Sequence, residues 1–424
     1  MAIFWPILAL LSAPRALAAS DAFALVSQAI RAKAAATYQG RQTIIWSLPA
    51  AQGGGTAEIV TALSHCGLRS RMTYLFPPSA AGRVMVDDGV QTSLYEPHRH
   101  CILVGPSVSR DTRSDGQAML RLMRRNYTCI VVRRERLNGK LCAVVAIRPR
   151  VLSGPYKLCW INLAQPFVLR LEEYDRTGCR NYVSAYDSIS FSPALAGGAF
   201  DLPPVARSAP RRTVRELSTT VSFAAPARLW KRAGFIGQVP ACLPPGYSLL
   251  RLSLLTPSPS APPLVQIRCS DGLQTLMITE SRAVGPTPSA AAINCSLARY
   301  GQQAWMLESR GVRIMVRGDL SLPPDIGVEM LHALMPGTEQ RLARAFKHQF
   351  GQVASKEVGV LRQAGWDYIE IVSAALFLHE HPSQVAVFHA LLGKQQPWPA
   401  VACKMHADAN ALDTQARAWI ATVR

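Results

Sequence analysis

The chain has 424 residues and a formal net charge of +19 at pH 7. This length exceeds one ordinary domain and fits two or three. Hydrophobic residues make up 49% of the chain and charged residues 17%, which excludes a disordered chain and supplies ample material for a core.

The N-terminus indicates a secretory signal peptide. Residues 3–11 are almost purely apolar, and Ala16-Leu17-Ala18 forms an A-x-A cleavage site before Ala19. A run of this length is too short to span a bilayer. A buried N-terminal helix is the alternative. We expect residues 1–18 to be removed and the mature chain to be soluble in the periplasm, because no later stretch reaches about 18 uncharged apolar residues.

The positive charge is concentrated in the first three quarters of the chain. Residues 19–335 hold 36 Lys and Arg against 20 Asp and Glu, whereas the tail from residue 336 holds nine against seven. A basic exported surface favours an acidic partner, such as lipid headgroups, lipopolysaccharide phosphates or an acidic protein segment. The alternative is that the Ala- and Arg-rich composition produces this charge without a role in binding.

Ten cysteines in an exported chain make disulfides plausible. Six lie in the first half, and they allow 15 pairings among which the sequence does not choose. No two cysteines are spaced C-x-x-C, which argues against a thioredoxin-type redox site and a zinc ribbon. Several cysteines could equally be small buried hydrophobic residues. The six are Cys66, Cys101, Cys129, Cys142, Cys159 and Cys179.

The first half predicts a long antiparallel sheet with two helices. Asp88-Gly89 and Asn138-Gly139 are hairpin signals between apolar runs. Residues 21–36 and 114–125 have helical periodicity, and Ser114 is a candidate cap for the second helix. About eleven short strands follow one another without β-α alternation. They predict an incomplete barrel with an apolar concave side open to a ligand.

Composition divides the rest of the chain. Residues 203–228 are rich in Pro, Arg, Ser and Thr and indicate a linker. Residues 229–336 predict a small antiparallel sheet with helical cover. Residues 337–424 predict helices, in which Trp366 and Trp398 begin two similar segments. These Trp-led segments favour packing over DNA recognition, so no nucleic acid is expected.

Motifs of catalysis and metal binding are absent from the sequence. It contains no G-x-S-x-G, no phosphate loop, no H-E-x-x-H and no G-x-G-x-x-G. His379-Glu380-His381 precedes Pro382, and two histidines at i and i+2 lie on different sides of a helix. We therefore expect a protein that is not an enzyme, with no cofactor and no metal. A hydrolase with an unrecognised site is the remaining catalytic alternative.

Short motifs recur in order along both halves. The first half has Tyr38-Gln39-Gly40, Tyr95-Glu96-Pro97, Asn126-Tyr127 and Tyr156-Lys157-Leu158-Cys159-Trp160-Ile161. The second half has Leu243-Pro244-Pro245-Gly246-Tyr247, Ser270-Asp271-Gly272-Leu273 and Val316-Arg317-Gly318-Asp319. In this order they resemble the MucB/RseB family of periplasmic sigma-factor regulators, over roughly residues 25–335. The cysteine inside the Leu-Trp motif departs from that pattern, and the tail has no counterpart in it.

The resemblance implies an α+β fold in three parts. Residues 19–202 would form a curled antiparallel half-barrel with helices, similar to the lipoprotein carriers LolA and LolB. A small antiparallel α+β domain (229–336) and an all-α region (337–424) would follow. The resemblance also implies a non-catalytic regulator that binds the periplasmic segment of a membrane anti-sigma factor. A lipid or lipopolysaccharide fragment would release that partner. A homo-oligomer is compatible with the sequence.

Two sets of residues are the candidate binding residues. The first would line a ligand cavity, and its alternative is ordinary core packing: Trp46, Tyr74, Leu94 and Trp160. The second would bind acidic groups of a partner, and its alternative is a solvated face: Arg121, Arg124, Arg125, Arg133, Arg134 and Arg136. A periplasmic carrier of lipid or lipoprotein, of the LolA type, is the second functional hypothesis.

Overall fold

The computed structural model describes most of the chain from Ala19 onward, with gaps in the last third. The described residues are 19–47, 54–150, 156–175, 178–220, 226–257, 261–285, 302–319, 322, 324–334, 341–342, 344–346, 361, 366, 368–384, 387–388 and 398–423. The predicted signal peptide therefore lies outside the described residues.

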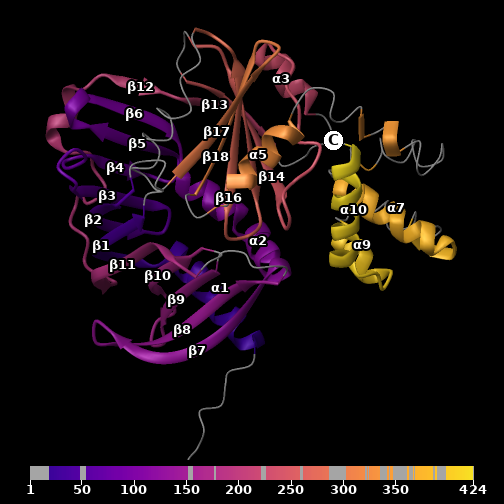
Figure 1. Ribbon diagram of the computed structural model, residues 1–424. Coiled ribbons are helices and arrows are strands. Elements are labelled where there is room, and N and C mark those ends of the chain that lie inside the picture. The colour runs from indigo at the N-terminus through magenta and orange to yellow at the C-terminus, as the bar shows by residue number, and fades with distance from the viewer. Residues whose placement is uncertain are drawn as a thin grey trace, which may run out of the picture.

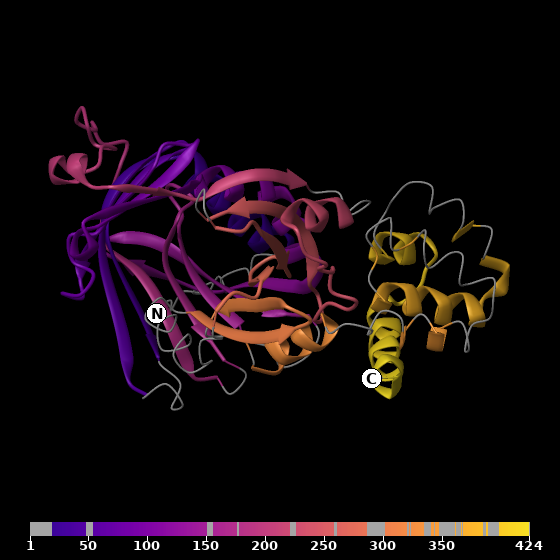
Figure 2. The same cartoon turned by 90° about the horizontal axis from the view of Figure 1, so that it is seen from above.

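The first part of the chain forms one 12-stranded sheet that is open at both edges. Its strand order is β12-β6-β5-β4-β3-β2-β1-β11-β10-β9-β8-β7, with β12 parallel to β6 and every other pair antiparallel. Figure 2 shows the sheet curving around one side. The strands are β1 (Thr37–Ser47), β2 (Thr56–Cys66), β3 (Arg69–Phe76), β4 (Val84–Asp87), β5 (Gln91–Glu96), β6 (Cys101–Pro106), β7 (Tyr127–Leu137), β8 (Lys140–Pro149), β9 (Tyr156–Asn162), β10 (Val168–Tyr174), β11 (Arg180–Phe191) and β12 (Arg211–Thr213).

Local turn chemistry explains the meander. Gly89 connects β4 to β5 with a φ of 88°, and Asn138 and Gly139 connect β7 to β8 with φ values of 50° and 76°. These left-handed conformations favour Gly and Asn, so the two hairpin predictions are confirmed.

Two helices pack on one face of the sheet. Helix α1 (Ala19–Ala35) contacts β7, β9 and β10, and α2 (Val108–Asn126) contacts α1 and β7 (Figure 1). Helix α2 begins six residues before the predicted start. The prediction that Ser114 caps it is wrong, because the side chain of Ser107 accepts a hydrogen bond from the Arg110 amide at 3.0 Å.

The segment predicted as a linker is ordered where it is described. Ala206 of a short helix, η3 (Pro204–Ser208), and Ala209, which follows it, pack on Ile102 and Val104 of β6. Strand β12 then joins the first sheet, and β13 (Arg215–Thr220) joins a second one. Val214 alone separates β12 from β13. The two sheets are therefore linked by β12 and β13, which follow each other in the chain with one residue between them.

The second sheet has six strands in the order β13-β14-β15-β16-β18-β17. Helices α3 (Ala227–Ala233) and α5 (Pro324–Ala333) pack against it, and its core holds Leu252, Ile267 and Val316. Its other strands are β14 (Ser248–Thr256), β15 (Leu264–Ser270), β16 (Thr275–Arg282), β17 (Gln302–Ser309) and β18 (Val312–Asp319). The chain is thus a mixed α+β protein with two large open sheets.

The described elements after residue 336 are helices. They are α7 (Tyr368–Glu380), η4 (Pro382–Gln384), α9 (Trp398–Lys404) and α10 (Ala409–Val423). The rings of Trp366 and Trp398 are both buried, 6.0 Å apart. Because much of 335–397 is outside the described residues, an all-α region over 337–424 stays a prediction.

Candidate functional site

The inner face of the large sheet, defined as the face that α1 and α2 contact, is the first candidate site. Strand register determines which side chains share it. Trp46 pairs with Tyr182, Tyr182 with Glu173, and Glu173 with Lys157, so these four lie in one row across β1, β11, β10 and β9. The same face carries Cys129 and Cys159, which pack against α1 and α2. The β7–β10 part of this face is therefore a packed core.

The β3–β6 part of the inner face is less covered. Register aligns Met72, Met85, Leu94 and Leu103 in one apolar row across four strands. Three of these side chains are half-buried, and Leu103 is 38% exposed. An aligned row of partly exposed apolar side chains on a concave face offers an apolar surface to a ligand.

The structure places three of the four predicted cavity residues on this inner face. Trp46 is buried, and Tyr74 and Leu94 are half-buried. Register places Trp160 on the opposite face, because it pairs with Arg170 and so aligns with Thr43 rather than with Trp46. The four residues therefore do not line one cavity.

Trp160 belongs to a buried cluster that includes Val144, Phe167 and Leu169. Its indole N–H donates to the Glu135 carboxylate. The guanidinium carbons of Arg133 and Arg170 lie 5.6 and 5.2 Å from its ring centre. Packing in this cluster, together with the two arginines and the hydrogen bond, leaves Trp160 only 4% exposed.

The six predicted anion-binding arginines do not form one cluster. Arg121 and Arg124 are exposed on α2, whereas Arg125 donates to the Gly246 carbonyl oxygen of the second sheet at 2.9 Å. Arg134 lies on β7, eight residues after Asn126, the last residue of α2. In an extended strand this separation is about 26 Å.

Their companions on β7 have internal partners. Arg133 is paired with Glu135 at 2.8 Å, and Arg136 donates to the Gly139 carbonyl oxygen at 2.9 Å. Arg121, Arg124 and Arg134 are therefore the exposed members of the set for which the described part of the chain shows neither an ion pair nor a hydrogen bond.

Charged residues join α2 to the second sheet. Arg251 of β14 bonds Asp111 and, at 2.9 Å, Asp115. Arg268 of β15 reaches the other oxygen of Asp115 at 2.9 Å. Asp115 is 4% exposed and Arg251 is 8% exposed, so these pairs are largely removed from water. Breaking one partner of such a pair is costly because it leaves an uncompensated buried charge.

A second charged cluster lies between the inner face and the second sheet. Lys157 bonds Glu173, and the Tyr127 hydroxyl donates to Asp271 at 2.5 Å. Burial raises the pKa of Asp271, and burial together with the nearby Glu173 and Asp271 raises the pKa of Asp319 to about 6, although Lys157 opposes this. Sequence reasoning missed this cluster, because its members lie in five separate elements.

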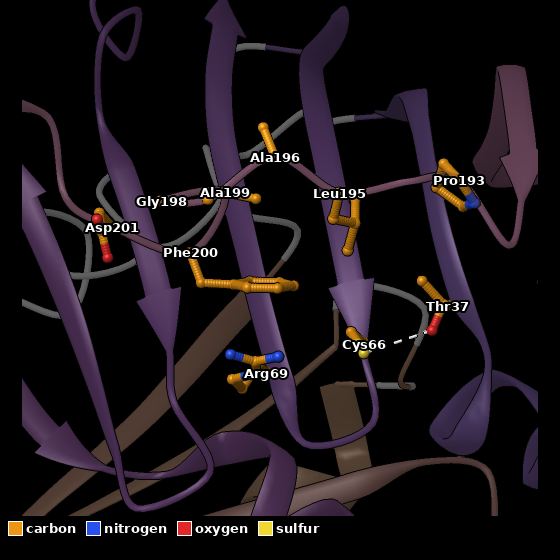
Figure 3. Close-up of a pocket in the computed structure, with 11 residues that line it drawn as sticks. Thr37, Cys66, Arg69, Pro193, Leu195, Ala196, Gly198, Ala199, Phe200 and Asp201 are labelled. Atoms are coloured by element: carbon orange, nitrogen blue, oxygen red, sulfur yellow. Dashed lines mark hydrogen bonds between the residues drawn. The ribbon is translucent and has the colours of Figure 1, made fainter.

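A cavity of about 460 Å³ lies between residues 193–201 and the ends of three strands, which are the start of β1, the end of β2 and the start of β3 (Figure 3). The Thr37 hydroxyl donates to the Cys66 sulfur at 3.4 Å, and the Arg69 guanidinium lies 4.8 Å from the Phe200 ring centre. The Thr37 hydrogen bond and the Arg69 charge lower the pKa of the Cys66 thiol against a smaller opposing effect of burial.

The six cysteines of the first half are free thiols, so the predicted disulfides among them are not formed. Four of them are buried in the sheet, as expected if they serve as small buried hydrophobic residues: Cys101, Cys129, Cys142 and Cys159. In the described part of the chain, no group of three His, Cys, Asp or Glu side chains is arranged to hold a metal ion. Across the same residues, no helix is both long and apolar enough to cross a membrane.

Comparison with known proteins gives matches in structure alone. No protein-family model and no curated protein matches the sequence. The complex of MucA and MucB from Pseudomonas aeruginosa is similar over 74% of this chain and 97% of that chain, with 14% identity and a TM-score of 0.44. A crystal structure of MucB covers 74% of this chain and 96% of its own, at 13% identity and a TM-score of 0.45.

A LolA superfamily protein from Nitrosomonas europaea is similar over 42% of this chain and 96% of its own. Its identity is 13% and its TM-score is 0.22. The two MucB structures bear the name of the family that the sequence motifs resemble.

Proposed function

We propose that this chain is an extracytoplasmic, non-catalytic regulator in envelope stress signalling. It binds the periplasmic segment of a membrane anti-sigma factor and responds to a lipid or lipopolysaccharide ligand. The ordered motifs of both sheets support the family assignment. The partly exposed apolar row Met72–Met85–Leu94–Leu103 is the observation that carries the ligand-binding part of the proposal.

An acidic partner segment would bind the exposed arginines. Arg121 and Arg124 stand on α2 and Arg134 on β7, and all three are exposed. The balance of 36 bases to 20 acids in residues 19–335 adds long-range attraction, which raises association rates with an acidic partner. Signal-peptide removal after residue 18 would place this surface in the periplasm.

A pull-down from an envelope extract tests the partner. We expect the mature protein to recover a membrane anti-sigma factor, and the Arg121→Glu/Arg124→Glu double variant to lose most of it. Arg228→Glu/Arg232→Glu is the matched control, because both arginines are exposed on α3 and carry the same charge change. Recovery of no anti-sigma protein by the wild type would contradict the proposal.

The alternative function is a periplasmic carrier of lipid or lipoprotein. The same apolar row supports it, since a carrier needs an apolar surface but no signalling partner. Native mass spectrometry with acyl ligands distinguishes the two functions. A protein that takes up acyl chains but recovers no anti-sigma factor is a carrier. A protein that takes up no acyl chains is not a carrier.

A single substitution tests whether the apolar row binds the ligand, whichever of the two functions is correct. Leu94→Glu places a charge in the middle of it and should abolish acyl uptake, because burying an unpaired carboxylate is costly. Val90→Glu introduces the same charge on an exposed turn residue and should leave uptake unchanged. Equal uptake by both variants would show that the ligand binds elsewhere.

The three-part organisation is part of the same proposal. The parts are a half-barrel (19–202), a small α+β domain (229–336) and an all-α region (337–424), with 203–228 between the first two. Size-exclusion chromatography with light scattering would decide whether the mature protein is a monomer or a homo-oligomer.

A further inference from the structure

Arginines gather at one edge of the large sheet, where β12 lies beside β6 (Figure 1). Residues 97–106 and 202–214 meet at this edge, and neither stretch contains an Asp or a Glu. In the described part of the chain, their arginine side chains have neither an ion pair nor a hydrogen bond. All four are exposed, and we call them the edge patch: Arg99, Arg207, Arg211 and Arg212.

Two short helices bring Arg99 and Arg207 together. Arg99 ends η2 (Pro97–Arg99), which precedes β6, and Arg207 belongs to η3, which precedes β12. Strands β6 and β12 pair in parallel, so the helices before them lie at the same end of the strands. The Ser208 hydroxyl oxygen lies 3.5 Å from the His100 ring nitrogen Nε2, and these residues directly follow the two arginines.

Arg211 and Arg212 flank the edge strand. Arg211 pairs with Ile102 and Arg212 with Leu103, and successive side chains of a strand point to opposite faces. Ile102 packs against residues of η3 and the turn after it, so Arg211 lies on the face that η3 covers. Arg212 lies on the other face, in line with Leu103. The edge patch therefore presents positive charge on both sides of the sheet edge.

The acidic residues nearest in sequence leave the edge patch positive. Glu96 is paired with Arg83 at 2.7 Å, and Glu216 is paired with Arg110 at 3.2 Å. Asp201 is exposed in the loop before η3 and sets one negative charge against the four arginines. A surface with this excess of positive charge attracts a dense array of anionic groups.

An exposed apolar side chain accompanies the arginines. Val205 of η3 is 60% exposed, whereas the next residue, Ala206, is 1% exposed. Cations beside an exposed apolar side chain suit the boundary between lipid headgroups and acyl chains. Charges that only protect a sheet edge from aggregation belong on the edge strand. Arg99, Arg207 and Val205 stand on helices, so protection of the edge does not account for them.

We propose that the edge patch binds the surface of an anionic phospholipid bilayer and holds the protein at the membrane. The lipid phosphates bind the arginines, and Val205 enters the interface. An arginine near an anionic bilayer strengthens binding about fivefold, so four supply a factor on the order of a thousand. The edge patch shares no residue with Arg121, Arg124 and Arg134, so the inference does not depend on an anti-sigma partner.

Co-sedimentation of the mature protein with vesicles tests this inference. We expect binding to vesicles that contain phosphatidylglycerol, no binding to vesicles of phosphatidylcholine alone, and weaker binding at high salt. Arg207→Gln/Arg211→Gln should weaken binding roughly thirtyfold. Arg228→Gln/Arg232→Gln is the matched control, because both arginines are exposed on α3 and the charge change is the same. The control should bind as the wild type does.

A second pair of variants tests the apolar contact. Val205→Ser should weaken vesicle binding several-fold, because it removes apolar area that the interface buries. Val90→Ser, at an exposed turn residue, should bind as the wild type does. Equal binding by these two variants would show that Val205 does not enter the interface and would contradict that part of the inference.

Two results would overturn the inference as a whole. The first is a wild type that does not bind the phosphatidylglycerol vesicles, and the second is an equal loss of binding in both arginine pairs. Polyglutamate is the probe for a different occupant. If polyglutamate binds and the vesicles do not, the edge patch is a site for an acidic protein segment, and bilayer binding is wrong.

Discussion

Gly272 lies directly against the backbone of Met123, where a side chain of any size has no room. A Cβ atom at Gly272 would come within 2.2 Å of the Met123 nitrogen, and the glycine has a φ of 104°. This glycine stands in the Ser270-Asp271-Gly272-Leu273 motif of the second sheet, and Met123 stands on α2. The motif therefore has a physical role: it lets the second sheet approach α2.

We expect Gly272→Ala to destabilise the protein by about 2–3 kcal/mol, because it adds both backbone strain and a backbone clash. Gly139→Ala is the matched control, since Gly139 also has a positive φ but nothing lies within 4 Å of its Cβ position. Urea denaturation measures both variants. Equal losses would mean that strain alone, and not the contact with α2, determines the effect.

Asp87 accepts hydrogen bonds at the start of α2 and should therefore make the stability of the protein depend on pH in the acid range. Burial disfavours its charge, but hydrogen bonds from Ser109, Gly89, Ser107 and Thr92 outweigh burial and lower its pKa. A lowered pKa contributes stability above the unfolded pKa, and this stability is lost as the pH falls through the folded pKa. We expect Asp87→Ala to cost about 2–4 kcal/mol at pH 7 and less at pH 3. A constant cost between pH 7 and pH 3 would contradict this account.

The contribution of Glu280 to protein stability should change with pH in the opposite direction. It is fully buried, accepts hydrogen bonds from Trp230 and Gln238, and burial raises its pKa to about 7. A raised pKa means that its stabilising protonated form is lost as the pH rises through 7.

We therefore expect Glu280→Gln to raise stability at pH 8 by about 2–3 kcal/mol and to have little effect at pH 5. Thermal unfolding at the two pH values measures the difference. Glu58→Gln, at an exposed residue of β2, should change neither value. A Glu280→Gln protein that is less stable at pH 8 would show that the charged form is the favoured one.

Cys66 should be more reactive than its exposure suggests. The Thr37 hydroxyl and Arg69 stabilise its thiolate, which is the form that reacts with iodoacetamide. We expect Thr37→Val to slow alkylation of Cys66 at pH 7 several-fold and to leave Cys179, an exposed thiol of the same chain, unchanged. Peptide mapping after timed alkylation gives both rates. A Thr37→Val protein with an unchanged Cys66 rate would contradict activation by the hydrogen bond.

Local signals predicted much of the first sheet. The Asp-Gly and Asn-Gly pairs define two hairpins, and turn chemistry of this kind needs no distant partner. The start of α2 was missed for a different reason. Ser107 and Asp87 are 20 residues apart, and their hydrogen bond selects the earlier cap over Ser114.

The candidate site was less predictable than the fold. Alternation along a strand shows which residues share a face, but β-bulges and the register between strands decide how distant strands align. Trp160 and Trp46 are on opposite faces for this reason. The contact of Asp115 with Arg251 joins residues 136 positions apart, and no sequence periodicity indicates such a pair.

The continuous path from β12 through Val214 into β13 limits how the protein can be dissected. A fragment that stops at residue 202 would lose β12 and leave the amides and carbonyls of β6 unpaired along the sheet edge. Unpaired edges recruit other chains and aggregate. The amino-terminal half, produced by itself, should therefore stay free of aggregation only if the fragment extends at least to residue 213.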